Sequence, residues 1–78
     1  MKVLTGTEYR LTGGVWNVKV TTTGTASLAY RVEAEPYQTI TGVDYTANAA
    51  DNITIPSCTV KPTLTGDAVM YLTLIENH

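Results

Sequence analysis

The glycines divide this chain into short segments, because each of them belongs to a Thr-Gly step. Glycine allows the positive φ that tight turns need. The residues between the steps are mostly Val, Ile, Thr, Tyr and Leu, which favour a pleated sheet. The pattern therefore predicts strands joined by turns. The steps are Thr5-Gly6, Thr12-Gly13 (extended by Gly14), Thr23-Gly24, Thr41-Gly42 and Thr65-Gly66.

Two neighbouring segments, residues 15–23 and 26–35, alternate between apolar and polar side chains. Such alternation indicates strands with one face toward a core. The short Thr23-Gly24 turn between them is typical of a β-hairpin. Gly13-Gly14 predicts a further tight turn that pairs residues 8–12 with the start of the first segment. The positions expected to face the core are Trp16, Val18, Val20, Leu28, Tyr30, Val32 and Ala34.

The remaining segments are also short. Pro36 ends the second alternating segment, because proline cannot donate to a strand ladder. Residues 37–42 follow as a short strand, residues 46–52 as a loop, and residues 68–75 as the last strand. Cys58 and Val60 are expected to point inward, and Pro62 to mark an edge or a bend. We predict one all-β domain over residues 1–78, a small antiparallel β-sandwich or partly open barrel of six or seven short strands.

A chain of 78 residues with a single cysteine has few means of adding stability. Small domains commonly rely on disulfides, metals or partner chains. Cys58 alone cannot form an internal disulfide, so self-association or docking onto a larger surface is the remaining means. The net charge of −2 and the scattered basic residues predict no nucleic-acid partner. No apolar run approaches the roughly 20 residues of a membrane span, and the chain start lacks a secretory apolar region. We therefore expect a soluble chain made in the cytoplasm.

The last predicted strand is apolar on both faces. Met70, Leu72 and Leu74 share one face, whereas the other carries apolar side chains interrupted only by Thr73. A surface strand normally has one polar face. Two interpretations follow: a neighbouring subunit covers the second face, or a loop or the N-terminal segment of the same chain does. The apolar residues of this second face are Val69, Tyr71 and Ile75.

The sequence offers little for catalysis or metal binding. The only histidine is His78, at the end of the sequence, and Cys58 is expected to be a small core residue. Glu33 and Glu35 share a predicted strand face, where paired carboxylates mostly serve solubility. Acidic residues around the predicted loop lack the spacing of a calcium loop. We expect no enzyme activity, no cofactor and no metal. The acidic and amide residues near that loop are Asp44, Asp51 and Asn52.

The aromatic residues leave one alternative open. Trp16 and Tyr30 fall on predicted inward faces and belong to the core. Tyr37, after Pro36, and Tyr45, at the start of the predicted loop, are expected to be exposed. Because exposed tyrosines can stack on sugars, a carbohydrate-binding or adhesive module remains the alternative function.

The stretches GVWNVKVTTTGTASLAYRVEAEPYQTI and IPSCTVKPTLTGDAVMYLTLIE resemble small all-β structural proteins of tailed-bacteriophage virions. The similarity is to capsid decoration (cement) proteins and to head-fibre and tail-fibre domains. It rests on the Thr-, Gly- and Ala-rich, Phe-free composition of most of the chain, without a short motif.

This resemblance implies a location in the virion and a mechanical function. Such proteins bridge the subunits of the major capsid protein, commonly as trimers. The implied self-contact is Val69, Tyr71 and Ile75, and the implied contacts to the capsid are the loops around Tyr37, Tyr45 and residues 46–52.

Overall fold

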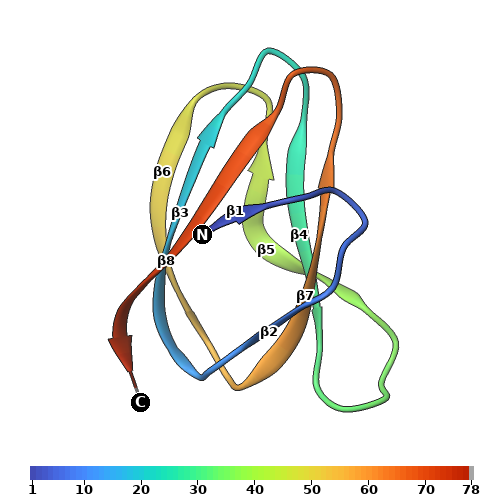
Figure 1. Cartoon of the computed structure of the whole chain (residues 1–78), viewed down its shortest axis with the longest axis vertical. Helices are drawn as coiled ribbons and strands as arrows, with labels where there is room; N and C mark the ends of the chain where they lie inside the picture. The colour runs from blue at the N-terminus through green and yellow to red at the C-terminus, as the bar shows by residue number, and fades with distance from the viewer. Residues whose placement is uncertain (78) are drawn as a thin grey trace.

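The computed structural model describes residues 1–77, which form eight β-strands and no helix (Figure 1). The strands are β1 (Lys2–Val3), β2 (Tyr9–Leu11), β3 (Gly14–Thr21), β4 (Ala26–Arg31), β5 (Gln38–Tyr45), β6 (Ala49–Ile55), β7 (Cys58–Leu64) and β8 (Val69–Asn77). The additional strand, relative to the six or seven expected, is the very short β1.

The strands form two antiparallel sheets that pack against each other. Sheet A has the order β1-β8-β3-β6, and sheet B has the order β2-β7-β4-β5. The prediction of a small antiparallel β-sandwich is therefore confirmed. Strands β1 and β2 lie at one edge of their sheets, and β5 and β6 lie at the other.

The core lies between the sheets and follows the predicted alternation. Trp16, Val18 and Val20 of β3 are buried, as is Leu28 of β4. Tyr30 and Val32 pack against this core, whereas Ala34 is exposed. Burial of Cys58 and Val60 is also confirmed. The alternation of apolar residues therefore places most of the core side chains correctly.

The predicted hairpin between residues 15–23 and 26–35 is wrong, because β3 and β4 belong to different sheets. Their connection is bonded to two other connections at the same end of the sandwich. Thr22 N–H donates to Asn48 Oδ1 at 2.9 Å, and Thr23 N–H donates to Asp67 Oδ1 at 2.8 Å. These bonds hold the connection where the chain crosses from sheet A to sheet B. Strand β3 therefore does not pair with β4, and its partners are β6 and β8.

Three other local expectations are corrected. Residues 9–11 pair with β7 and not with β3. Strand β4 ends at Arg31, and Glu33 lies in the following turn with φ 57, so Glu33 and Glu35 do not share a strand face. Most of the predicted loop at residues 46–52 is strand, since β6 begins at Ala49.

Pro62 lies within β7, between β2 and β4, and is buried. Strand β2 pairs only with residues 58–60 of β7, so it ends before reaching Pro62. The Pro62 carbonyl accepts a hydrogen bond from Gly6 N–H at 2.9 Å. Because the N and O of one residue point to the same side of a strand, the missing N–H of Pro62 removes no bond from the β4 ladder.

Candidate interaction surface

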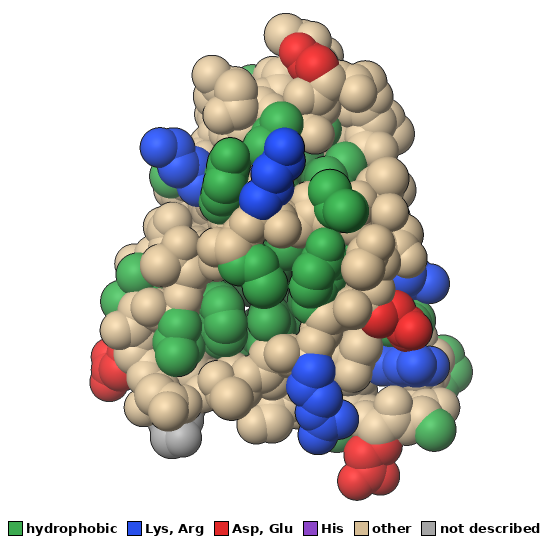
Figure 2. Space-filling model, viewed as in Figure 1, with side chains coloured by type: hydrophobic (Ala, Val, Ile, Leu, Met, Phe, Trp, Pro, Cys, Tyr) green, Lys and Arg blue, Asp and Glu red, His purple; other side chains and the backbone are tan. Residues whose placement is uncertain are grey.

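The exposed large hydrophobic side chains of residues 1–77 gather around β1 and β8. Monomeric proteins rarely leave such side chains clustered in water, and a cluster of this kind commonly marks an interaction site. Figure 2 shows hydrophobic side chains gathered in the middle of the face that carries these strands. We call the exposed large hydrophobic residues together the β1–β8 surface; they are Met1, Leu4, Tyr71, Leu74 and Ile75.

The geometry of β8 explains why this surface is open. Strand β1 pairs with only Met70 and Tyr71 of the much longer β8, and Met1 extends this pairing to Leu72. Beyond that point β8 is bonded on one side to β3. We call residues 73–77 the β8 overhang. In this segment one edge of β8 has no neighbouring strand among the described residues.

A β-bulge lies in the β8 overhang. Val15 of β3 pairs with Glu76 and Trp16 pairs with Leu74, so Ile75 is the extra residue. A bulge bends the strand and changes the direction of its side chains. Leu74 is left 40% exposed and Ile75 56% exposed. Two consecutive apolar side chains therefore meet water at this position.

The outer face of sheet A is more polar than the β8 overhang. Tyr71 pairs with Lys2 of β1 on one side and with Lys19 of β3 on the other. Side chains that pair directly across strands lie on the same face. Beside Tyr71 lies a shallow hollow of about 390 Å³, lined by Asn17, Lys19, Thr21, Tyr71 and Thr73. The face thus offers one aromatic ring among amide, hydroxyl and ammonium groups.

The structure separates the residues of the expected self-contact. Tyr71 is 44% exposed and Ile75 is exposed, but Val69 is partly buried. Strand β8 is a central strand between β1 and β3, but no loop or N-terminal segment among residues 1–77 covers Tyr71, so the same chain does not cover the second face at this residue. The contact with a neighbouring subunit stays a prediction.

The sequence did not single out Met1, Leu4 or Leu74 as exposed. Leu74 was expected to share the buried face of Met70 and Leu72. The alternation does not show at which residue the burial of this face ends. Leu4 stands directly before the Thr5-Gly6 turn, which is the one local indication of its exposure.

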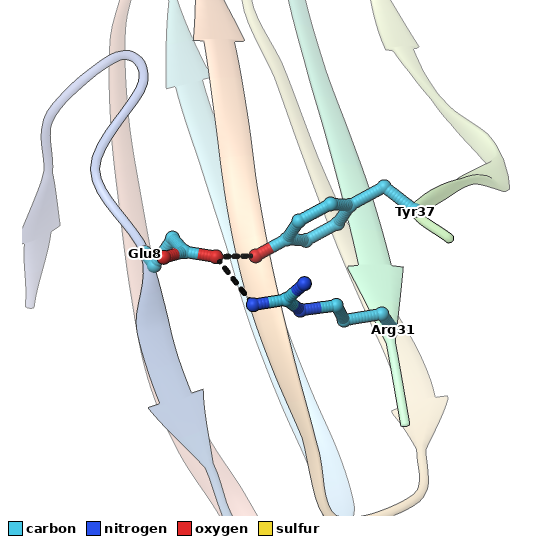
Figure 3. A network of polar contacts seen from close by, with 3 residues as sticks. All are labelled: Glu8, Arg31 and Tyr37. Atoms are coloured by element: carbon cyan, nitrogen blue, oxygen red, sulfur yellow. Dashed lines mark hydrogen bonds and ion pairs between the residues drawn. The ribbon is translucent and has the colours of Figure 1, made fainter. Parts of the chain in front are cut away.

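Tyr37 lies in a polar cluster and not on an open surface (Figure 3). Glu8 Oε2 accepts hydrogen bonds from Arg31 Nη2 at 3.0 Å and from the Tyr37 hydroxyl. Arg31 Cζ lies 4.8 Å and Lys61 Nζ 4.5 Å from the centroid of the Tyr37 ring, within range of cation–π attraction. The cluster joins the loop before β2, the end of β4 and the loop before β5.

The ionisation of this cluster follows from its contacts. The hydrogen bond from Tyr37, together with the charges of Arg31 and Lys61, lowers the pKa of Glu8. Burial and the bond to Glu8 raise the pKa of Tyr37. Both shifts favour the ionised carboxylate and the neutral phenol, which are the forms that make the observed bond. The cluster is thus a structural connection near neutral pH.

Tyr45 is buried at 9% exposure, so its expected exposure is wrong. Its hydroxyl donates to Asp51 Oδ2 at 2.8 Å, which links β5 of sheet B to β6 of sheet A. Burial, followed by the bond to Asp51, raises the pKa of Tyr45 to about 12. Asp51 therefore accepts a bond at the β5–β6 edge, and it does not flank an open loop.

Residues 1–77 hold no group of three or more His, Cys, Asp or Glu side chains arranged for a metal. His78 lies outside the described residues. Cys58 is 2% exposed, and burial raises the pKa of its thiol, which disfavours the thiolate. It is a core residue, as expected.

Comparison with known proteins gives no relative. No family model matches the chain, and neither a curated protein nor a solved structure matches it. The described part of the chain contains no helix long and apolar enough to cross a membrane. The residues of the β1–β8 surface and their geometry therefore carry the functional argument.

Proposed function

We propose that this chain is a structural protein of a tailed-bacteriophage virion, an oligomeric capsid decoration protein that assembles through the β1–β8 surface. The single observation that carries the proposal is the concentration of exposed large hydrophobic side chains on that surface. The resemblance of the sequence to virion proteins supplies the setting. A decoration protein needs a rigid sandwich and a place to self-associate, and both requirements suit this chain.

The size of the surface is compatible with this function. A specific interface covers about 800 Å² on each partner. That is roughly a sixth of the 4595 Å² that the chain exposes. One edge of the sandwich and its neighbouring face supply such an area, which leaves the remaining surface for a second contact with the major capsid protein.

The proposed capsid contacts lie at opposite ends of the sandwich. The loop that carries Tyr37 precedes β5, and residues 46–48 follow it (Figure 1). Strand β5 (Gln38–Tyr45) separates these loops by about 25 Å. A flat capsid lattice therefore contacts only one of these two loops. The Tyr37 side chain is already hydrogen-bonded to Glu8, which leaves it less free to bind a partner. We assign the capsid contact to residues 46–48, which are exposed.

The test is the assembly of the purified protein and its association with particles. Light scattering should give a multiple of the 8.4 kDa chain mass, with a trimer as the number that the resemblance favours. The double substitution Tyr71→Asp and Ile75→Asp should produce a folded monomer. Thr54→Asp, at an exposed position of β6, is the matched control and should leave assembly unchanged. A wild-type chain that stays monomeric and is absent from purified virions would contradict the proposal.

One observation favours carbohydrate binding as a second candidate. The Tyr71 ring beside the hollow has amide, hydroxyl and ammonium groups around it, the kinds of group that bind a sugar ring and its hydroxyls. Tyr71 is, however, the single exposed aromatic among the described residues. Glycan-array binding that is lost in Tyr71→Ala would support this candidate, whereas no binding by wild type would exclude it.

A further inference from the structure

We infer that a second copy of this chain pairs antiparallel with the β8 overhang, so that sheet A continues from one copy into the other. The inference rests on the proposed function, because it names the partner and its position within the β1–β8 surface. The β8 overhang combines an unpaired strand edge with two exposed apolar side chains, Leu74 and Ile75.

The unpaired edge follows from the bonds of Leu72. Leu72 N–H donates to the Met1 carbonyl at 2.8 Å, and the Leu72 carbonyl accepts from the Met1 amine at 2.8 Å. Main-chain groups of alternate residues point to the same side of a strand, so those of Leu74 point to the same side as those of Leu72. No strand among residues 1–77 lies there. Such an edge is a template for another extended chain.

The dimensions of the β8 overhang favour a second overhang as the occupant. A two-fold axis between Ile75 and Glu76 sets Leu74 of one copy against Asn77 of the other. Leu74 pairs with Trp16 and Asn77 pairs with Gly14, so the two residues lie on the same face of sheet A. The two overhangs then cover each other from Leu74 to Asn77, and they stop short of Leu72, where Met1 of each copy already occupies the edge. An isologous contact of this kind uses the same surface twice.

Charge complementarity also favours this arrangement. Lys2 pairs with Tyr71 and Glu76 pairs with Val15, so both charged side chains lie on the outer face of sheet A. A two-fold axis perpendicular to the sheet keeps that face common and moves Glu76 of one copy toward Lys2 of the other. Stacking the two outer faces instead would bring Lys2 and Lys19 of both copies together, and like charges repel.

The bulge at Ile75 keeps the pairing short. Bulges at edges limit extended ladders, so main-chain bonds alone give a weak contact. The side chains of Leu74 and Ile75 must therefore contribute much of the affinity. Substitution of these side chains should have a larger effect than any change on the outer face.

The experiment is sedimentation of the full chain and two single variants over a wide range of concentration. Wild type should form a dimer and not the trimer that the resemblance implies, because an isologous two-fold contact closes at two copies. Ile75→Lys should weaken it by about tenfold or more, as expected for an apolar residue at the centre of an interface. Thr54→Lys, at an exposed position of β6, is the matched control, and it should leave the dissociation constant within about threefold. Circular dichroism checks that both variants remain folded, as the exposure of both positions predicts.

A charge exchange tests the orientation. Lys2→Glu and Glu76→Lys should each weaken the dimer by about threefold, and the double variant should regain most of the loss. Within one copy these residues lie at different ends of β8, so rescue requires contact between copies. Failure of rescue would overturn the antiparallel pairing.

The outcomes separate this inference from the proposed function. A trimer that Ile75→Lys does not disrupt would overturn the pairing while leaving self-association in place. A chain that stays monomeric at every concentration would overturn both. A dimer with the expected ranking of variants supports the pairing.

Discussion

The two edges of this sandwich are built differently. At the β5–β6 edge, the Tyr45 hydroxyl bonds to Asp51 across the two sheets, and the neighbouring exposed positions include Asp44, Asn52 and Thr54. At the β1–β8 edge, the Tyr9 hydroxyl of β2 accepts a bond from Leu4 N–H at 2.8 Å next to β1, but the exposed positions of the β8 overhang include Leu74 and Ile75. Polar groups protect the first edge from association. The β8 overhang lacks this protection, and we infer that it is where a partner binds.

The largest expected effect is a difference in stability between substitutions in the buried part of β8 and in the β8 overhang. Leu72 is 1% exposed, so Leu72→Ala should lower the free energy of unfolding by about 2–5 kcal/mol. Leu74→Ala removes a side chain that already contacts water and should cost about 1 kcal/mol or less in the monomer. Urea denaturation measures both. Equal losses would show that the overhang is as well packed as the rest of β8.

Gly14 supports the bulge of the β8 overhang. A Cβ at this position would meet the carbonyl oxygen of Glu76, so Gly14→Ala must displace the end of β8. We expect a loss of roughly 1–3 kcal/mol in thermal or urea unfolding, together with weaker self-association. Gly42→Ala is the control, because it also has a positive φ but nothing lies within 4 Å of its Cβ. If Gly42→Ala lowers the free energy of unfolding as much as Gly14→Ala does, the contact with Glu76 does not explain the loss.

Tyr45 makes the β5–β6 edge sensitive to high pH. Its pKa of about 12 in the folded chain exceeds the ordinary value of about 10. A raised pKa adds stability that is complete below about pH 10 and is lost as the pH rises toward 12. We expect the free energy of unfolding to fall over this window, and to fall less in Tyr45→Phe. Tyr37→Phe serves as the control for the other tyrosine with a raised pKa.

The smallest effect is expected from the polar cluster of Glu8. The pKa of Glu8 is lowered, so its carboxylate adds stability above its unfolded pKa and loses it as the pH falls through the folded value. Glu8→Gln should therefore lower the melting temperature slightly at neutral pH, and the difference from wild type should shrink as the pH falls. A difference that stays constant as the pH falls would show that the charge has no part in the connection.

The sequence predicted the faces of the strands better than their partners. Alternation is local, so Trp16, Val18 and Leu28 were placed correctly in the core. Pairing is not local: the turn at Thr23-Gly24 looks the same whether the chain folds back into one sheet or crosses to the other. The crossing depends on Asn48 and Asp67, which lie far along the chain.

The candidate surface was predicted only in part. Two apolar faces on residues 68–75 drew attention to Tyr71 and Ile75, and both are exposed. The alternation did not show the bulge, which depends on the register with β3 and exposes Leu74. Tyr45 was misplaced because its burial depends on the bond to Asp51 across the sheets.

Hydrogen exchange at the Leu74 amide tests the central claim most directly. This N–H points to the unpaired edge of the β8 overhang, whereas Leu72 N–H is already bonded to Met1. We predict that exchange at Leu74 slows as the protein concentration rises into the range of assembly, while exchange at Leu72 changes little. Exchange at Leu74 that stays fast in the assembled protein would contradict the account.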